Sequence, residues 1–350
     1  MSSLPKIVFA DRFFMTQSAM KLLESVGEIV LAPEKAEKKL MVKVQGATAI
    51  IAEYNRITAS VMDAAKGTLK GIVAYGVGYN HIDVSAATER GICVANCKGS
   101  NAEAVAELAV TLMLNISRGT HVGDRFIRDG RWLSDESGEL PPVLRGRELA
   151  HKTLGLVGMG EIGRRVARIA KGFEMRILVF DPCLSPEVAR QQGAEPVDLV
   201  SLTSQADYVS IHGPLSAETK DLIGEKEISL MKPTAYLINT ARGALVDEKA
   251  LLTALQRKKI AGAALDVFSV EPLPMRSGFL KLDNVILTPH IGGVTEEALA
   301  EVSYMSAKEA ARIARGEVPV NLVNRKELAA NGFLVQRGFG SEVPEVKAHH

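Results

Sequence analysis

Three side chains that can bind an acid and move a proton follow apolar runs in the second half of the chain, namely Arg242, Glu271 and His290. Arginine carries a permanent charge on a planar fork that can bind a carboxylate through two hydrogen bonds. Histidine titrates near neutral pH and can exchange a proton with an oxygen atom, and a carboxylate beside it would orient the ring. Each residue alone would be an ordinary surface or loop side chain. If the runs are parallel strands, however, their carboxyl ends share one crevice and the three side chains would meet there.

A glycine-rich turn lies upstream of these residues. Gly158–Gly163 reads Gly-x-Gly-x-x-Gly, follows the apolar run 153–157 and opens an amphipathic segment. In a dinucleotide-binding turn, the first glycine allows a sharp bend, the second lets the backbone approach a pyrophosphate, and the third lets helix and strand pack closely. The following helix would offer free N–H groups and a partial positive charge to the phosphates. The turn therefore predicts a dinucleotide site.

Asp181 bears on which nicotinamide dinucleotide is bound. It directly follows the next apolar run, 176–180, where a carboxylate can accept hydrogen bonds from the adenosine ribose. A carboxylate in this place would repel a 2′-phosphate, so the sequence predicts NAD rather than NADP as cofactor. The alternative interpretation, a tight turn and a helix-capping aspartate, is disfavoured by the full strand–turn–helix–strand context.

The elements that must position these residues form two consecutive α/β series. Continuous apolar runs separated by helical spacing are typical of parallel strands in a sheet covered on both faces. The predicted strands are 6–10, 28–31, 47–51, 71–74 and 91–95 in the first series and 153–157, 176–180, 208–211, 235–239, 261–265 and 285–287 in the second. The predicted helices include 13–24, 101–118, 164–171 and 295–315, and an irregular arm is expected over 128–148. We therefore expect an α/β protein with two doubly wound parallel-sheet domains.

Composition narrows the classes of function. The chain has 350 residues, and 42 Lys and Arg against 41 Asp and Glu leave a net charge of +1, which argues against nucleic-acid binding. No apolar run approaches the ~18 residues of a membrane span. The three cysteines, Cys93, Cys97 and Cys183, form no Cys-x-x-Cys unit, so we expect neither a disulfide framework nor a metal site. These features predict a cytoplasmic protein that binds neither nucleic acid nor membrane.

Together, the motifs resemble those of the D-isomer-specific 2-hydroxyacid dehydrogenase family. The resemblance extends from about Lys6 to Asn324 and rests on Gly158–Gly163 with Asp181, His212–Leu215 through Thr219, Asn239–Gly243, Asp266, Glu271-Pro272 and Pro289–Gly293. It implies an NAD-dependent oxidoreductase that transfers a hydride reversibly between nicotinamide and a small 2-keto or 2-hydroxy acid. It also implies that a Rossmann nucleotide-binding domain, 101–289, is inserted into a flavodoxin-like substrate domain made of 1–100 and 290–325, with 326–350 as a C-terminal tail.

The resemblance assigns roles to individual residues. It implies that Arg242 binds the substrate carboxylate and polarises the keto group, that His290 is the acid/base, and that Glu271 is its partner. Asp266 would hold the nicotinamide carboxamide. The implied cofactor-binding residues are Gly158, Gly160, Glu161, Ile162, Gly163, Asp181, Pro214, Thr219, Thr240, Ala241, Arg242, Asp266, Gly292 and Gly293. Besides Arg242, the implied substrate-binding residues are Tyr75, Gly76, Val77 and Gly78, a turn whose N–H groups would bind the substrate carboxylate from the other domain.

Two departures bear on the substrate. Members that resemble phosphoglycerate dehydrogenases have Arg two residues before the first glycine of that turn, whereas this chain has Ala74. This difference predicts an unphosphorylated, glyoxylate- or hydroxypyruvate-like acid. Glu271 stands where formate dehydrogenases of the family have Gln, which argues against formate oxidation. The alternatives are phosphite or phosphoglycerate oxidation on the same fold, and an NAD-sensing, corepressor-like binding protein.

The arm over 128–148 carries Trp132, which is the only tryptophan, and the pair Pro141-Pro142. An exposed tryptophan on a long arm more often marks a subunit contact than free surface. We therefore expect a homodimer joined through the nucleotide-binding domains, as the resemblance also implies. An arm folded back on its own domain is the alternative.

Overall fold

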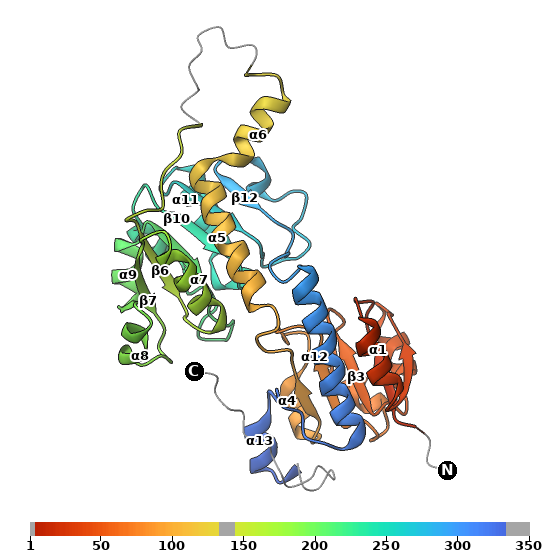
Figure 1. Cartoon of the computed structure of the whole chain (residues 1–350). Coiled ribbons are helices and arrows are strands. Elements are labelled where there is room, and N and C mark those ends of the chain that lie inside the picture. Colours follow the sequence, from red (N-terminus) through yellow and green to blue (C-terminus); the bar gives the residue numbers. More distant parts are fainter. Residues whose placement is uncertain (1–3, 133–143, 334–350) are drawn as a thin grey trace. The chain divides into compact units, whose positions relative to one another are not determined.

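The computed structural model describes residues 4–132 and 144–333 (Figure 1). Its contacts divide the chain into two units, Met1–Asn101 with Val294–His350, hereafter the split unit, and Ala102–Gly293, hereafter the inserted unit. The boundaries expected from the sequence, after residues 100 and 289, lie one and four residues before these. Pro141-Pro142 and the last residues of the chain, including His349-His350, lie outside the described residues.

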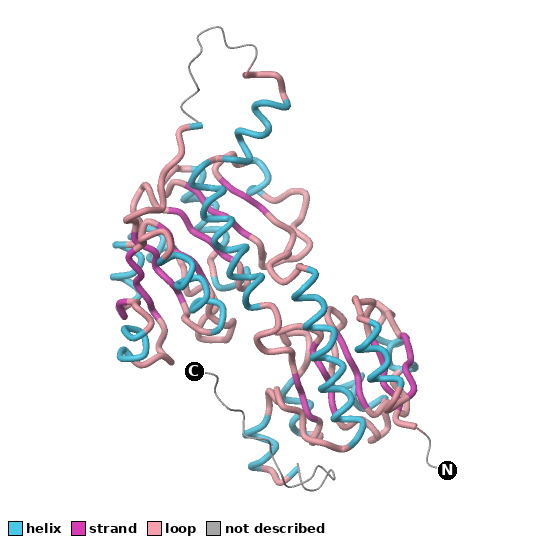
Figure 2. The backbone as a smooth tube through the Cα atoms, in the orientation of Figure 1, coloured by secondary structure: helices cyan, strands magenta, loops and turns pink. Residues whose placement is uncertain are grey.

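The split unit is a parallel sheet with helices on both faces (Figure 2). Its strands lie in the order β2-β1-β3-β4-β5. Their bounds are β1 Lys6–Phe9, β2 Glu28–Leu31, β3 Ala49–Ala52, β4 Gly71–Ala74 and β5 Cys93–Ala95. The helices are α1 Gln17–Glu24, α2 Glu37–Lys43, α3 Ala59–Ala64, α4 Val84–Glu89, α12 Glu296–Arg315 and α13 Arg325–Ala330. Alternate strand residues pack against α2, α3 and α4 on one face and against α1 and α12 on the other.

The inserted unit is a second parallel sheet, with the strand order β12-β11-β10-β9-β6-β7-β8. The strands are β6 Thr153–Val157, β7 Arg176–Phe180, β8 Glu195–Pro196, β9 Tyr208–Ile211, β10 Tyr236–Asn239, β11 Gly262–Leu265 and β12 Val285–Leu287. The helices are α5 Ala102–Arg118, α6 Thr120–Arg128, α7 Glu161–Lys171, α8 Pro186–Gln191, α9 Leu199–Gln205, α10 Glu225–Leu230 and α11 Glu248–Gln256. The apolar core on one face includes α5 and α7, and the core on the other includes α9, α10 and α11.

The order of the strands reverses beside β6. The chain runs from β6 to β7 on one side, then returns to form β9 on the other side of β6. The helices that follow β6 and β9, α7 and α10, therefore lie on opposite faces of the sheet. Ligands bind at such a switch point in open α/β sheets.

Some element boundaries differ from the expectation. The helix predicted from residue 13 begins only at Gln17, because Thr16 caps it by accepting a hydrogen bond from the N–H of Ala19 at 3.2 Å. Residues 120–128, which the sequence analysis assigned to no element, form α6. The first part of the predicted tail from 326 forms α13, which covers 325–330 and buries Leu328 against Val318 and Leu322.

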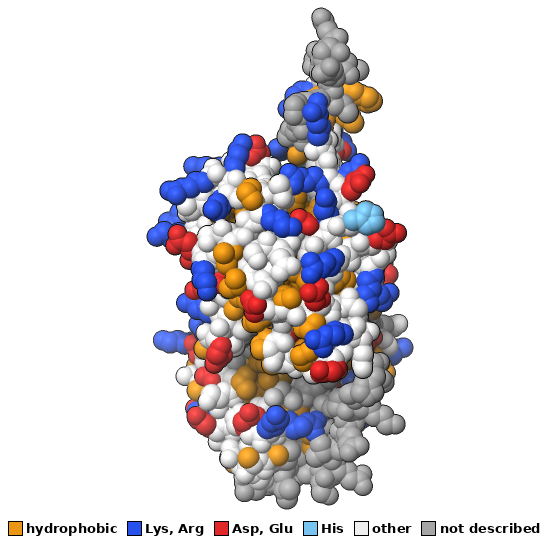
Figure 3. Space-filling model, turned by 90° about the vertical axis from the view of Figure 1, so that its left-hand side faces the viewer, with side chains coloured by type: hydrophobic (Ala, Val, Ile, Leu, Met, Phe, Trp, Pro, Cys, Tyr) orange, Lys and Arg blue, Asp and Glu red, His pale blue; other side chains and the backbone are white. Residues whose placement is uncertain are grey.

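Charged side chains of both signs are interspersed on the face drawn in Figure 3, in keeping with the near-zero net charge. Within the described residues, no helix is both long and apolar enough to cross a membrane.

Candidate active site

The glycine-rich turn joins β6 to α7 at the switch point. Gly158 has φ +93°, and a Cβ there would lie 2.7 Å from the backbone nitrogen of Gly213, so both the backbone angle and the space require glycine. A Cβ on Gly163 would lie 2.4 Å from the carbonyl oxygen of Gly158, which shows how closely α7 approaches the turn. At Gly160, by contrast, a Cβ would have no atom within 4 Å. Two glycines are thus needed for packing, and the third leaves open space beside the backbone.

Asp181 lies at the carboxyl end of β7 and is hydrogen-bonded to the glycine-rich turn. Its Oδ2 accepts a hydrogen bond from the N–H of Met159 at 2.8 Å, and its Oδ1 accepts one from the N–H of Cys183 at 2.9 Å. A carboxylate oxygen has more than one lone-pair direction, so both oxygens can accept further hydrogen bonds from a ligand. Glu161 and Ile162 begin α7, where the backbone N–H groups have no partner within the helix.

The segment after β9 forms the opposite wall of the turn. His212 is partly buried, and its Nε2 lies 2.8 Å from the hydroxyl of Ser210. Burial lowers the pKa of His212 to about 4, so its ring is neutral at physiological pH. Pro214 and Thr219 belong to a loop that closes on itself, since the Thr219 hydroxyl donates to the Pro214 carbonyl at 2.8 Å.

The segment after β10 presents Arg242. Asn239 shapes this bend, because its side chain accepts from the N–H of Ala241 at 3.0 Å and donates to the carbonyl of Arg242 at 2.9 Å. The guanidinium of Arg242 donates to the carbonyl of Ala241 at 2.6 Å, and its other donors have no hydrogen-bond acceptor among the described residues. Burial holds the pKa of Arg242 below its ordinary value, and the charge of Glu271 opposes this shift.

Asp266, which follows β11, fixes the loop that carries His290. Its backbone carbonyl accepts from the N–H of His290 at 2.8 Å. Its buried carboxylate accepts three hydrogen bonds from that loop: from the hydroxyl of Thr288 at 2.6 Å and from the N–H groups of Ile291 and Gly292 at 2.9 and 2.8 Å. The side chain is only 1% exposed. The structure therefore gives Asp266 a structural task, whereas the predicted contact with a nicotinamide carboxamide stays a prediction.

His290 and Glu271 form a pair. The His290 Nδ1 lies 2.7 Å from Oε2 of Glu271, while Oε1 of that carboxylate accepts from the N–H of Phe268 at 2.9 Å. Burial acts to raise the pKa of Glu271, but the hydrogen bonds from His290 and Phe268 and the charge of Arg242 outweigh it and bring the pKa below its ordinary value. Because a carboxylate can only accept, Nδ1 carries the proton, and Nε2 is the atom left to exchange one.

The backbone at His290 is unusual. Its φ of +55° lies in the left-handed region, which non-glycine residues seldom adopt. The bonds from Asp266 on both sides of the residue hold this conformation in place. Such strain is common at functional sites, where the surrounding structure fixes an unfavourable conformation.

Two polar residues that hold the site in shape, Asn239 and Thr288, had no role predicted from the sequence. Asn239 and Thr288 contact only backbone or carboxylate groups of the loops already described. Asn239 is the last residue of β10 and Thr288 directly follows β12, and a polar residue at the end of an apolar run is a signal that could have identified both. Two buried polar atoms have no hydrogen-bond partner in the described residues. They are Oγ1 of Thr240, a predicted cofactor-binding residue, and Nδ1 of His212.

The predicted substrate-binding turn lies in the split unit, after β4. The ring of Tyr75 stacks on Phe13, its hydroxyl donates to the Phe14 carbonyl at 2.5 Å, and its N–H donates to the Ala52 carbonyl at 2.7 Å. Tyr75 is therefore engaged in the core of its own unit. The N–H groups of Gly76, Val77 and Gly78 donate to no acceptor in the described part of the chain. Their contact with a substrate carboxylate stays a prediction.

Comparison with known proteins decides the family. Residues 110–292 match the family model described as D-isomer specific 2-hydroxyacid dehydrogenase, NAD binding domain. The chain is 42% identical over 331 residues to the glyoxylate reductase of Thermococcus litoralis, which covers 93% of this chain and 99% of that protein. The chain belongs to the D-isomer-specific 2-hydroxyacid dehydrogenase family. It is therefore an oxidoreductase that acts on CH–OH groups, and it contains the NAD-binding domain of that family.

Two further relatives of this dehydrogenase match most of its length. The D-3-phosphoglycerate dehydrogenase of Methanocaldococcus jannaschii is 40% identical over 91% of this chain but over only 59% of its own length. The crystal structure of a glyoxylate reductase from Paecilomyes thermophila superimposes with a TM-score of 0.83 at 32% identity and covers 93% of this chain and 100% of that one.

The inserted unit of the dehydrogenase fits NAD. The open space at Gly160 lies beside the first N–H groups of α7, a combination that suits a pyrophosphate. Asp181 can accept from ribose hydroxyls. Thr240 offers a buried hydroxyl that has no partner in the described residues. Groups of the right polarity thus lie along the carboxyl ends of β6, β7 and β10.

Proposed function

We propose that this dehydrogenase reduces glyoxylate and other small, unphosphorylated 2-keto acids with NADH. The observation that carries the proposal is the 2.7 Å contact between His290 Nδ1 and the Glu271 carboxylate, since it leaves Nε2 as the proton donor for a keto oxygen. The name of the Thermococcus litoralis relative, which matches nearly the full length of both chains, supports the choice of substrate.

Arg242 binds the acid. Its guanidinium retains donors that have no acceptor among the described residues, and it is partly buried, which strengthens its interaction with an anion. Two of these donors can bind the carboxylate of a 2-keto acid, and a third can reach the keto oxygen. The positive charge then stabilises the negative charge that develops on this oxygen during reduction.

His290 supplies the proton. When bound, the reduced nicotinamide supplies the hydride that reaches the keto carbon. The oxygen then takes the proton from Nε2 of His290, and Glu271 stabilises the protonated ring that must exist beforehand. In the reverse direction the same nitrogen accepts the proton of the hydroxyl. His212 is neutral, and its Nε2 is bonded to Ser210, so it is poorly placed for this task.

Asp181 supports NAD over NADP. Its carboxylate is fixed at the end of β7 by the N–H groups of Met159 and Cys183, so it cannot easily turn away from a 2′-phosphate. Like charges in a crevice of reduced dielectric constant repel strongly. We therefore propose that the enzyme prefers NADH to NADPH. Asp181→Ser should reduce this preference, because it weakens the binding of NADH and removes the charge that repels NADPH.

Ala74 supports an unphosphorylated substrate. It is fully buried in β4, at the position where an arginine would be needed to meet a phosphate. Phosphoglycerate oxidation is therefore the less favoured activity. A corepressor-like protein that only senses NAD would have no use for the Glu271–His290 pair or for the free donors of Arg242.

A substrate panel tests the proposal. Initial rates of NADH and NADPH oxidation are measured with glyoxylate, hydroxypyruvate, pyruvate and 3-phosphohydroxypyruvate. We expect the highest kcat/KM with glyoxylate or hydroxypyruvate and NADH. A higher kcat/KM with 3-phosphohydroxypyruvate would contradict the substrate class, and equal values for NADH and NADPH would contradict the cofactor preference. No oxidation with any of the acids would favour phosphite oxidation or the corepressor-like alternative.

We also propose a cytoplasmic homodimer. The cysteines are free thiols, with Cys93 and Cys97 buried and Cys183 exposed, which suits a reducing compartment. Ile127 and Trp132 are 57% and 61% exposed. Both belong to the segment around α6, which projects from the end of α5 in Figure 1. An apolar surface of this kind suits contact with a second copy of the chain.

A further inference from the structure

An acidic residue stands where the cofactor's phosphates are expected. Glu161 is the first residue of α7, directly after the open space at Gly160. A glutamate is favourable for the helix dipole at this position, but its charge would repel a pyrophosphate bound to the same helix end. The inserted unit therefore needs a way to offset this charge.

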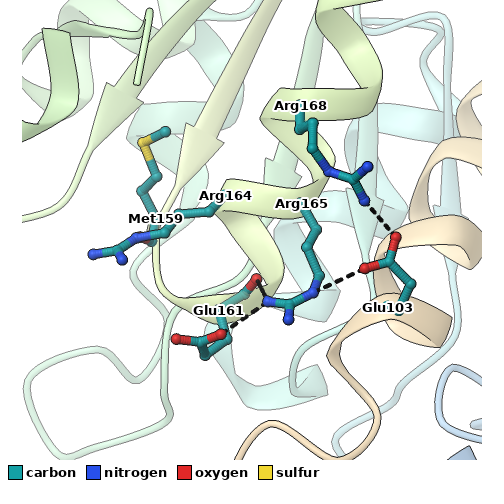
Figure 4. A network of polar contacts seen from close by, with 6 residues as sticks. All are labelled: Glu103, Met159, Glu161, Arg164, Arg165 and Arg168. Atoms are coloured by element: carbon teal, nitrogen blue, oxygen red, sulfur yellow. Dashed lines mark hydrogen bonds and ion pairs between the residues drawn. The ribbon is translucent and has the colours of Figure 1, made fainter. Parts of the chain in front are cut away.

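Two arginines on α7 neutralise two carboxylates (Figure 4). Arg165 donates to the Glu161 carboxylate and to its carbonyl, both at 2.8 Å, and to Glu103 of α5 at 3.0 Å. Arg168 donates to the other oxygen of Glu103 at 2.5 Å. Within this cluster each negative charge is matched by a positive one, and the Glu161 side chain is held against Arg165.

Arg164 is the surplus cation of the group. It donates through Nε to the Met159 carbonyl at 3.2 Å, and its two terminal nitrogens have no hydrogen-bond acceptor among the described residues. Figure 4 shows its side chain pointing away from Glu103, toward Met159. Met159 is also the residue whose N–H is bound by Asp181. The guanidinium is thus tethered to the glycine-rich turn itself and is half-buried there.

We propose that Arg164 binds a phosphate group of the cofactor, while Arg165 cancels the charge of Glu161. A guanidinium fixed through Nε presents its two terminal nitrogens as a planar pair of donors, which matches two phosphate oxygens. The proposal deepens the cofactor-binding part of the proposed function. Its test measures cofactor binding without any keto acid. The role of Arg164 can therefore be refuted while the proposed reduction of keto acids stands, and the proposed reduction can be refuted while the role of Arg164 stands.

The phosphate can belong to either of two places in the cofactor. A pyrophosphate is present in both NADH and NADPH, whereas the 2′-phosphate is present only in NADPH. An equal loss of affinity for both would assign Arg164 to the pyrophosphate. A loss confined to NADPH would assign it to the 2′-phosphate.

Dissociation constants of NADH, NADPH and adenosine are measured by calorimetry for the full chain and for Arg164→Gln. We expect Arg164→Gln to raise the dissociation constant of NADH, NADPH or both by about tenfold, the scale of a charge-assisted hydrogen bond. The dissociation constant of adenosine, which has no phosphate, should stay unchanged. Arg168→Gln is the matched control, because it removes the same charge from the same helix on the side of Glu103. It should change none of the three constants by more than about twofold.

Two further variants separate binding from folding. Arg164→Lys keeps the charge and should recover part of the lost affinity. Glu161→Gln removes the neighbouring negative charge and should tighten NADH binding. Unchanged affinity of Arg164→Gln for both dinucleotides would overturn the proposal. An equal loss of affinity of Arg164→Gln for adenosine would also overturn it. So would a lower melting temperature of Arg164→Gln, if Arg164→Lys restores the melting temperature but not the affinity.

Discussion

His290 is held by two residues: Glu271, whose carboxylate contacts Nδ1, and Asp266, whose hydrogen bonds to the N–H groups of His290 and Ile291 fix the left-handed backbone. Together they aim Nε2 without tying it to the protein. Replacing the ring with a methyl group in His290→Ala should lower kcat for glyoxylate reduction by about 10²-fold or more at neutral pH. The dissociation constant of NADH should stay within about twofold, because the glycine-rich turn is untouched. Near-normal turnover would remove His290 from the mechanism.

Glu271 should act through the charge that it places beside this ring. The lowered pKa of Glu271 means that the carboxylate is ionised across the working pH range. Reduction needs a protonated imidazole, so its rate falls as pH rises. In Glu271→Gln the protonated ring loses its negative partner, and the fall should move to lower pH. The pH dependence of kcat/KM for both proteins measures this. A midpoint that stays in place, or moves to higher pH, would exclude the electrostatic role.

At the scale of elements, two glycines of the same turn allow a matched comparison. A Cβ on Gly163 would lie 2.4 Å from the Gly158 carbonyl oxygen, so Gly163→Ala must push α7 away from β6 and should cost about 2 kcal/mol of unfolding free energy. A Cβ on Gly160 meets nothing within 4 Å. Gly160→Ala should therefore fold with unchanged stability yet weaken NADH, because the methyl group occupies the space left for the pyrophosphate. Thermal melts and NADH titrations of both variants decide the matter, and equal stabilities would contradict it.

Most strands could be predicted because each is a short apolar run bounded by polar residues. The runs 153–157, 176–180 and 208–211 coincide with β6, β7 and β9. α6 was missed because Gly119, Gly123 and Gly130 indicate a broken chain, although Gly119 with φ +59° only separates α6 from α5. α13 was missed because Leu328 is buried partly against Cys93 of β5, which is distant in sequence.

The site could be predicted where a residue type carries the chemistry, as for Arg242, Glu271 and His290, whose roles stay predictions. It could not be predicted where a contact joins distant segments. The Asp266 carboxylate binds residues more than twenty positions away, and no local pattern reveals that it fixes the His290 loop. The pairing of Arg165 with Glu161 and Glu103 is hidden in the same way, because Glu103 belongs to a different helix.

At the scale of the whole molecule, the segment around α6 should join two copies of the chain. We predict a dimer whose mass by light scattering persists on dilution and is lost when residues 131–142 are deleted. Trp132→Ser should weaken the dimer, since it removes an aromatic side chain that is 61% exposed. Tyr304→Ser, which removes another exposed aromatic side chain from α12, is the control and should leave the mass unchanged. A stable monomer, or a dimer unaffected by the deletion, would contradict a role of the arm in dimerisation.

Hydride transfer to the carbon of a 2-keto acid can be followed directly with NADH that carries deuterium at both C4 positions. The protein reduces glyoxylate with this NADH in ordinary water, and the glycolate is analysed by mass spectrometry and NMR. We predict glycolate with one deuterium on C2 and none on the exchangeable hydroxyl, because the hydride comes from the nicotinamide and the proton from His290 and the solvent. Glycolate without deuterium on C2, or no glycolate from wild-type protein that binds NADH, would contradict the proposed reaction.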